Sequence, residues 1–239
     1  MLTINEIKSE ARKDLAGNYR LGIRLAMFYF LINMTTTFIP TLFVGTGVVQ
    51  TGLYLVACFV TFAISAYISI GLSACFLKIA LCKPTGIGDF FEALRNKKSM
   101  GGLALWVASL EILPAMALTL SISFVPESYA KNKLVILLIY ALYYLVILTI
   151  KMHVLPAFFL IHDIENDNPA LVITMSTWLG RSASHDYLLK MWFSFIPLLI
   201  AGFLSFGIGL LYMYPYICSC NAIYYLELCK LAEETKKEE

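Results

Sequence analysis

The chain has 239 residues, of which 59% are hydrophobic and only 14% are charged, and its mean hydropathy is +0.76. A soluble domain is about 45–50% apolar and about 25% charged, so this composition excludes a soluble globular protein and requires lipid to cover part of the surface. The net charge of +2 is too small to indicate a nucleic-acid partner.

A short amphipathic helix is predicted over residues 3–17, before the first apolar run. Thr3 and Glu6 have the spacing of a capping box, in which two side chains satisfy the first amides of a helix. Ile7 and Leu15 recur at helical spacing, with charged residues between them. We expect this helix to lie on the inner membrane surface. Charges spread through the segment argue against a cleavable signal peptide.

Six apolar runs reach the roughly 20 residues that a spanning helix needs. They predict an all-α, polytopic membrane protein with a single membrane domain and spans near residues 25–44, 53–77, 102–125, 134–161, 187–206 and 208–229. Gly207 would supply the turn between the last two runs, because glycine relieves backbone sterics. An alternative division places that turn at Tyr214 and Pro215, which leaves a last helix too short to span comfortably.

The basic residues predict the orientation of the chain. With the N-terminus inside, Lys131 and Lys133 fall outside and Lys151 falls within a helix, whereas the other fifteen of the eighteen Lys and Arg are cytoplasmic. Cytoplasmic loops of membrane proteins carry this excess of positive charge. We therefore expect a multi-pass protein of the bacterial cytoplasmic membrane with both termini cytoplasmic, the tail being residues 230–239.

Two further short amphipathic segments suggest internal repetition. Residues 87–98 and 169–180 resemble the first segment, and the three begin about 83 residues apart, at Ile4, Ile87 and Ala170. One interpretation is three repeated units, each an interfacial helix followed by a helical hairpin, as parallel repeats occur in membrane proteins. The other is that any six-helix protein contains three hairpins.

Two buried charges are predicted to meet inside the membrane. At 1.5 Å per residue, Glu111 lies about 14 Å from the inner end of its helix and Lys151 about 15 Å from the inner end of the next. Sequential helices are neighbours, and an unpaired charge in hydrocarbon is costly, so we expect an ion pair. The pair would either fix the helix register or line a polar cavity for a ligand or proton, near the helix-breaking Pro114 and Pro156.

Two other ionisable residues lie within the apolar runs. His153 is two residues from Lys151, about 200° around the helix, so the two do not share a face. His153 would either titrate beside a ligand or hydrogen-bond to a neighbouring helix. Glu227 lies near the inner end of its helix, where we expect a cap or an interfacial position.

No residue pattern indicates catalysis. The six cysteines form no C-x-x-C pair and have no histidine at zinc-ligand spacing, so no metal is predicted. Ser182, Ser184, His185 and Asp186 are hydrolase residue types, but no G-x-S-x-G elbow surrounds them. We predict no enzymatic activity and no cofactor.

Both ends of the chain resemble a bacterial membrane-protein family that is catalogued as domain of unknown function 975. The resemblance covers TINEIKSEAR at 3–12, LAGNY at 15–19, PAFFL at 156–160, GIGL at 207–210 and AIYYLEL at 222–228. The middle is less similar, because residues 145–147 read LVI where family members often carry Pro-Gly-Ile. The resemblance implies a multi-pass bacterial membrane protein and implies no activity.

We therefore expect a non-enzymatic membrane protein that binds or moves a small or lipidic ligand. The alternative is an accessory protein with a membrane-protein partner, such as a partner subunit, an assembly factor or an immunity factor. A membrane-embedded enzyme is third, because no cluster of histidines or acids is visible on one face.

Overall fold

The computed structural model describes residues 2–45, 47–96, 99–124, 133–164, 168–182, 185–205 and 207–238. These residues contain helices and no strand, which confirms the all-α prediction. The helices are α1 (Ile4–Ala16), α2 (Tyr19–Thr41), α3 (Val48–Ala80), α4 (Ile87–Asn96), α5 (Ser99–Phe124), α7 (Lys133–Asp163), α8 (Pro169–Ser182), α9 (His185–Phe193), α10 (Ile196–Leu204) and α11 (Ile208–Glu238). The predicted outer loop with Lys131, the end of the 102–125 run and the last tail residue lie outside the described residues.

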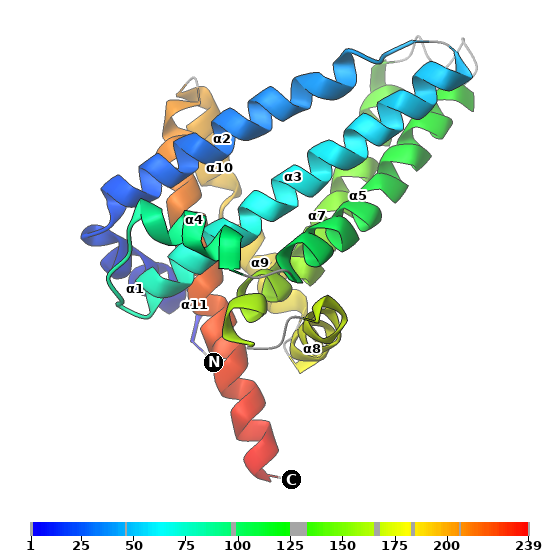
Figure 1. Cartoon of the computed structure of the whole chain (residues 1–239). Coiled ribbons are helices and arrows are strands. Elements are labelled where there is room, and N and C mark those ends of the chain that lie inside the picture. Colours follow the sequence, from blue (N-terminus) through cyan, green and yellow to red (C-terminus); the bar gives the residue numbers. More distant parts are fainter. Residues whose placement is uncertain are drawn as a thin grey trace.

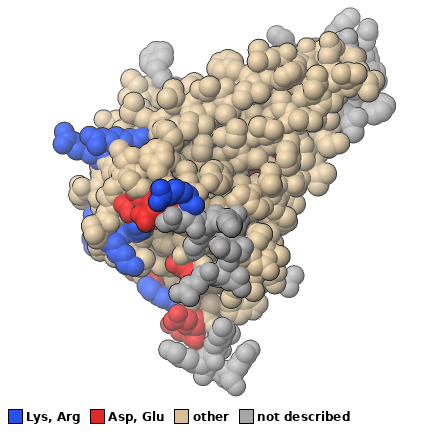
Figure 2. All heavy atoms as spheres, viewed as in Figure 1, with Lys and Arg blue, Asp and Glu red and all other residues tan. Residues whose placement is uncertain are grey.

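Among the described residues, four helices are long and apolar enough to cross a membrane: α2, α3, Met100–Leu118 of α5 and Leu137–Asp163 of α7. Figure 1 shows these four running in a common direction away from a more compact end. Large apolar side chains such as Leu31, Phe38 and Val48 are exposed on them. Charged residues gather around the compact end, and the surface over the extended helices is almost free of them in this view (Figure 2). The structure thus has the surface of a membrane protein.

The last two predicted spans fold differently from the first four. Run 187–206 is divided between α9 and α10, of which α10 has only nine residues, about 14 Å of helix against about 30 Å of hydrocarbon. Gly207 has φ +82°, which confirms the predicted turn. Pro215 lies inside α11, so the alternative turn at that position is wrong. One spanning helix over 187–206 is not confirmed.

Much of α11 is covered by protein. Tyr216 is buried against Phe195, and the guanidinium of Arg12 in α1 lies 5.6 Å from the centre of its ring. From Pro215 to Tyr225 every residue except half-buried Cys218 is buried. Figure 1 shows α11 crossing the direction of α2 and α3. The apolar character of run 208–229 is therefore explained largely by other helices packing on it.

The helix α1 begins with the predicted capping box: the Glu6 amide donates to the Thr3 hydroxyl, and the Thr3 amide donates to the Glu6 carboxylate. Its apolar residues Ile7 and Leu15 are fully buried, and α1 packs mainly on α11. The apolar face was expected to enter the lipid interface, but it enters the protein core. Because protein-buried faces and lipid-facing ones share the same periodicity, the sequence does not distinguish them.

Glu227 of α11 ties down the N-terminal segment. Its carboxylate accepts hydrogen bonds from the Leu2 amide at 3.0 Å and from the Lys230 ammonium at 2.6 Å. The hydroxyl of Tyr187 donates to the Leu2 carbonyl at 2.6 Å. Glu227 is thus a tertiary anchor for the N-terminal segment, a role that we did not predict, and its position at the membrane interface stays a prediction.

The two other short helices pack in the same manner as α1. The helix α4 lies on α3, where the Lys78 ammonium bonds to the Asp89 carboxylate and holds the pKa of Asp89 below its usual value. The helix α8 packs on α7 and buries Val172 and Leu179. Thus α4 and α8 each rest on the long helix that precedes them, whereas α1 rests on the last helix of the chain.

Cys82 provides a native reporter of orientation. It is the exposed cysteine among the six and lies in the turn between α3 and α4, at φ 53°. If the N-terminus is cytoplasmic, we expect a membrane-impermeant maleimide to leave Cys82 unlabelled in intact cells and to label it after permeabilisation. A Cys82→Ser variant should lose that signal. Labelling of Cys82 in intact cells would reverse the predicted orientation.

Candidate ligand cavity

The predicted pair of intramembrane charges is present between α5 and α7. The Lys151 ammonium lies 3.8 Å from a carboxylate oxygen of Glu111. The two side chains differ in environment, because Glu111 is 6% exposed and Lys151 is 49% exposed. At 3.8 Å this contact is longer than a good hydrogen bond, and a carboxylate has room for about four such bonds. The pair is therefore loose, and its buried member is poorly satisfied.

A cavity of about 260 Å³ opens beside this pair. Six helices contribute to it: α2, α3, α5, α7, α9 and α11. Its wall is mainly apolar, and its polar side chains include Ser65, Ser69, Ser73, Glu111, Lys151, Trp192 and Asn221. Of the described residues that line it, Lys151 alone is exposed, so its side chain marks the open side.

Two lining residues carry buried polar atoms that lack a partner. The indole nitrogen of Trp192 and the amide oxygen of Asn221 are buried and form no hydrogen bond. Ser219 has a third such atom but does not line the cavity. Most buried polar atoms in proteins are paired, and an unpaired one costs about 1–3 kcal/mol. The geometry therefore leaves a donor and an acceptor unsatisfied beside one cavity.

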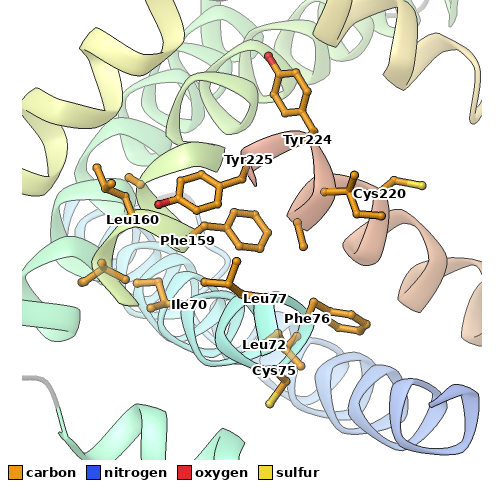
Figure 3. Packing of buried hydrophobic residues seen from close by; sticks show 14 of the residues in the cluster. Ile70, Leu72, Cys75, Phe76, Leu77, Phe159, Leu160, Cys220, Tyr224 and Tyr225 are labelled. Carbon is orange, nitrogen blue, oxygen red and sulfur yellow. The ribbon is translucent and has the colours of Figure 1, made fainter. Parts of the chain in front are cut away.

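Three lining residues of the cavity, Ser73, Phe158 and Phe159, belong to a polar and aromatic layer. The Ser73 hydroxyl donates to the Phe158 carbonyl, and the His162 ring nitrogen Nε2 lies 2.8 Å from the Ile70 carbonyl and 3.1 Å from the Ser73 hydroxyl. Tyr225 stacks on Phe159 with ring centres 5.4 Å apart. Figure 3 shows the two rings beside each other. This layer joins α3, α7 and α11 beside the cavity.

His153 lies away from the ion pair, as its angle around α7 predicts. It lines a separate pocket of about 170 Å³ with Trp106 and Ser176, and its Nδ1 atom lies 2.8 Å from the Thr149 carbonyl. The three predicted site residues thus divide into Glu111 and Lys151 at one cavity and His153 at another.

Trp192 and Asn221 were not predicted as site residues. Trp192 is one of three tryptophans near the predicted inner interface, where such rings are common. Asn221 offered a signal, because an amide within an apolar run needs a partner. Among the described residues, no three His, Cys, Asp or Glu side chains form a group that could hold a metal ion.

Long apolar helices that present lipophilic surface are the property of a helical membrane protein. The chain matches no family model, no curated protein and no solved structure at a significant level. The resemblance of its two ends to domain of unknown function 975 therefore stays a prediction.

Proposed function

We propose that this protein is a non-enzymatic, multi-pass protein of the bacterial cytoplasmic membrane that binds a small amphipathic or lipidic ligand in the cavity beside Glu111 and Lys151. The observation that carries the proposal is the group of unsatisfied polar atoms around that cavity. Glu111, Trp192 and Asn221 all line it: Glu111 is held only by a long ion pair, and the other two carry a buried polar atom with no hydrogen bond.

A purely structural ion pair would not need this arrangement. Structural pairs inside membranes are stabilised by close contact and by further hydrogen bonds that satisfy both groups. Here the charges lie 3.8 Å apart beside an open volume of about 260 Å³. A ligand that supplied the missing hydrogen bonds would recover part of the cost of burying these groups.

The packing of the short helices supports three related units, α1–α3, α4–α7 and α8–α11. The helix α4 packs on α3 of the first unit, α8 on α7 of the second, and α1 on α11 of the third. The returning helices α3, α7 and α11 contact one another, and all three line the cavity. Sites between repeated units are common in membrane transporters, so this arrangement favours ligand binding at the unit interface.

If α1 marks the inner surface, α10 and the start of α11 form a hairpin that enters only part of the bilayer.

The test is extraction into native lipid nanodiscs, followed by mass spectrometry of everything that co-purifies. We expect a specific lipid or small molecule with the wild-type protein and its loss in Glu111→Gln. His153→Ala is the matched control, because His153 lines the other pocket. Only bulk lipid in all three samples would contradict the proposal. A stoichiometric protein partner would instead support the accessory role.

A further inference from the structure

The cavity presents both signs of charge and both kinds of hydrogen-bonding group. Glu111 and Asn221 offer acceptors, whereas Lys151 and Trp192 offer donors. The ion pair has no net charge, so a ligand with a single charge would be attracted to one member and repelled by the other. A ligand with both charges matches both members.

We propose that the ligand is a zwitterionic amphipath with an N–H-bearing ammonium group and a phosphate or carboxylate. Its ammonium group binds Glu111 and Asn221, and its anion binds Lys151 and Trp192. This ligand class rests on the proposed function, because it names the chemistry of a ligand bound in that same cavity.

The acceptor side requires N–H groups on the cation. Glu111 is 6% exposed and is held by the Lys151 ammonium at 3.8 Å, and the Asn221 amide oxygen has no hydrogen-bond partner. A primary ammonium has three N–H donors, whereas a quaternary ammonium has none. The site should therefore prefer the former.

The two hydrogen-bond donors, Lys151 and Trp192, would bind the anion of the ligand at the open side of the cavity. Lys151 is the exposed member of the lining and has Glu111 as its partner, at a distance too long for a good hydrogen bond. Trp192 adds an indole N–H that has no partner and can only donate. An anion bound here satisfies the indole and shares the ammonium with Glu111.

The remaining wall selects an amphipath. Leu72, Phe76, Val107 and Val154 are buried apolar residues of the lining. A volume of about 260 Å³ is at the small end for ligand pockets, so it holds a polar head with a short apolar segment rather than a whole lipid. The shared chemistry fits the head of a zwitterionic phospholipid or a soluble amino-phosphate compound.

The experiment compares the melting temperature and native mass spectrum of the detergent-purified protein with four probes. These are a short-chain phosphatidylethanolamine, the matching phosphatidylcholine, the matching phosphatidylglycerol and soluble glycerophosphoethanolamine. We expect binding of the ethanolamine lipid at least about tenfold tighter than of the choline lipid, and little binding of the glycerol lipid. Binding of glycerophosphoethanolamine as tight as that of the ethanolamine lipid would identify a soluble source, and much weaker binding would identify a membrane source.

Three variants separate the two levels of the proposal. Glu111→Gln should remove the preference for ethanolamine over choline, Trp192→Phe should weaken both lipids alike, and His153→Ala should change neither. Equal binding of all lipids, or an unchanged preference in Glu111→Gln, would overturn the zwitterionic class. Ser69→Phe places a large side chain in the cavity. If the lipids bind without preference but this variant abolishes their binding, they bind in the cavity, and the proposed function survives while the zwitterionic class does not. No binding of any probe to the wild-type protein would overturn the zwitterionic class, and the nanodisc experiment would then decide the proposed function separately.

Discussion

Lys151→Met is expected to destabilise the protein more than Glu111→Gln, although the two substitutions break the same ion pair. Glu111 is 6% exposed, so removing Lys151 leaves a buried carboxylate with no partner. Breaking a tight buried pair costs about 3–5 kcal/mol, and we expect a smaller loss here because the pair is long, its Lys151 is half-exposed, and a buried carboxyl can take up a proton. Removing Glu111 instead leaves an ammonium that is half-exposed and can extend toward a polar region. We expect a loss near 1 kcal/mol for that variant. Melting temperatures in one detergent would measure the difference.

The double variant tests whether the two residues are coupled. Glu111→Gln combined with Lys151→Met removes both charges, so most of the stability lost in Lys151→Met should return. Lys230→Met is the matched control, since Lys230 also bonds to a buried carboxylate. That carboxylate, Glu227, keeps the hydrogen bond from Leu2, so its loss should stay within about 1 kcal/mol. If the two single losses simply add in the double variant, Glu111 and Lys151 do not interact.

The sequence predicted those features that depend on the spacing of nearby residues or on the depth of a residue in the membrane. The capping box of Thr3 and Glu6 depends on three residues of spacing, and it is present. The pairing of Glu111 with Lys151 followed from equal depth on sequential helices, and it is present. Such features need no knowledge of which distant helices meet.

The last third of the chain was harder to predict, because an apolar run does not say what covers it. Apolar residues leave water equally well for lipid and for protein. Between Pro215 and Tyr225, α11 is enclosed by other helices, and α1 buries Ile7 there as well. Trp192 and Asn221 escaped prediction for a related reason, since a missing partner becomes visible only when every packed neighbour is known.

Gly22→Ala is expected to disrupt the contact between α2 and α11. A methyl group at Gly22 of α2 would lie 2.8 Å from the Pro215 Cβ atom of α11, closer than carbon atoms approach in proteins. Pro215 is held in a ring and cannot rotate away, so the helices must separate. Overpacking of this kind costs about 1–3 kcal/mol. A lower melting temperature would measure it.

The same substitution should also weaken ligand binding, because the α2–α11 contact continues to the cavity. Tyr29 and Tyr214 stack across it with ring centres 4.7 Å apart, and both line the cavity. Gly52→Ala is the control, since its new methyl group would meet nothing within 4 Å and alanine favours the helix. It should leave both properties unchanged or slightly raise stability. Equal melting temperatures for the two variants would mean that α2 and α11 do not pack closely at Gly22.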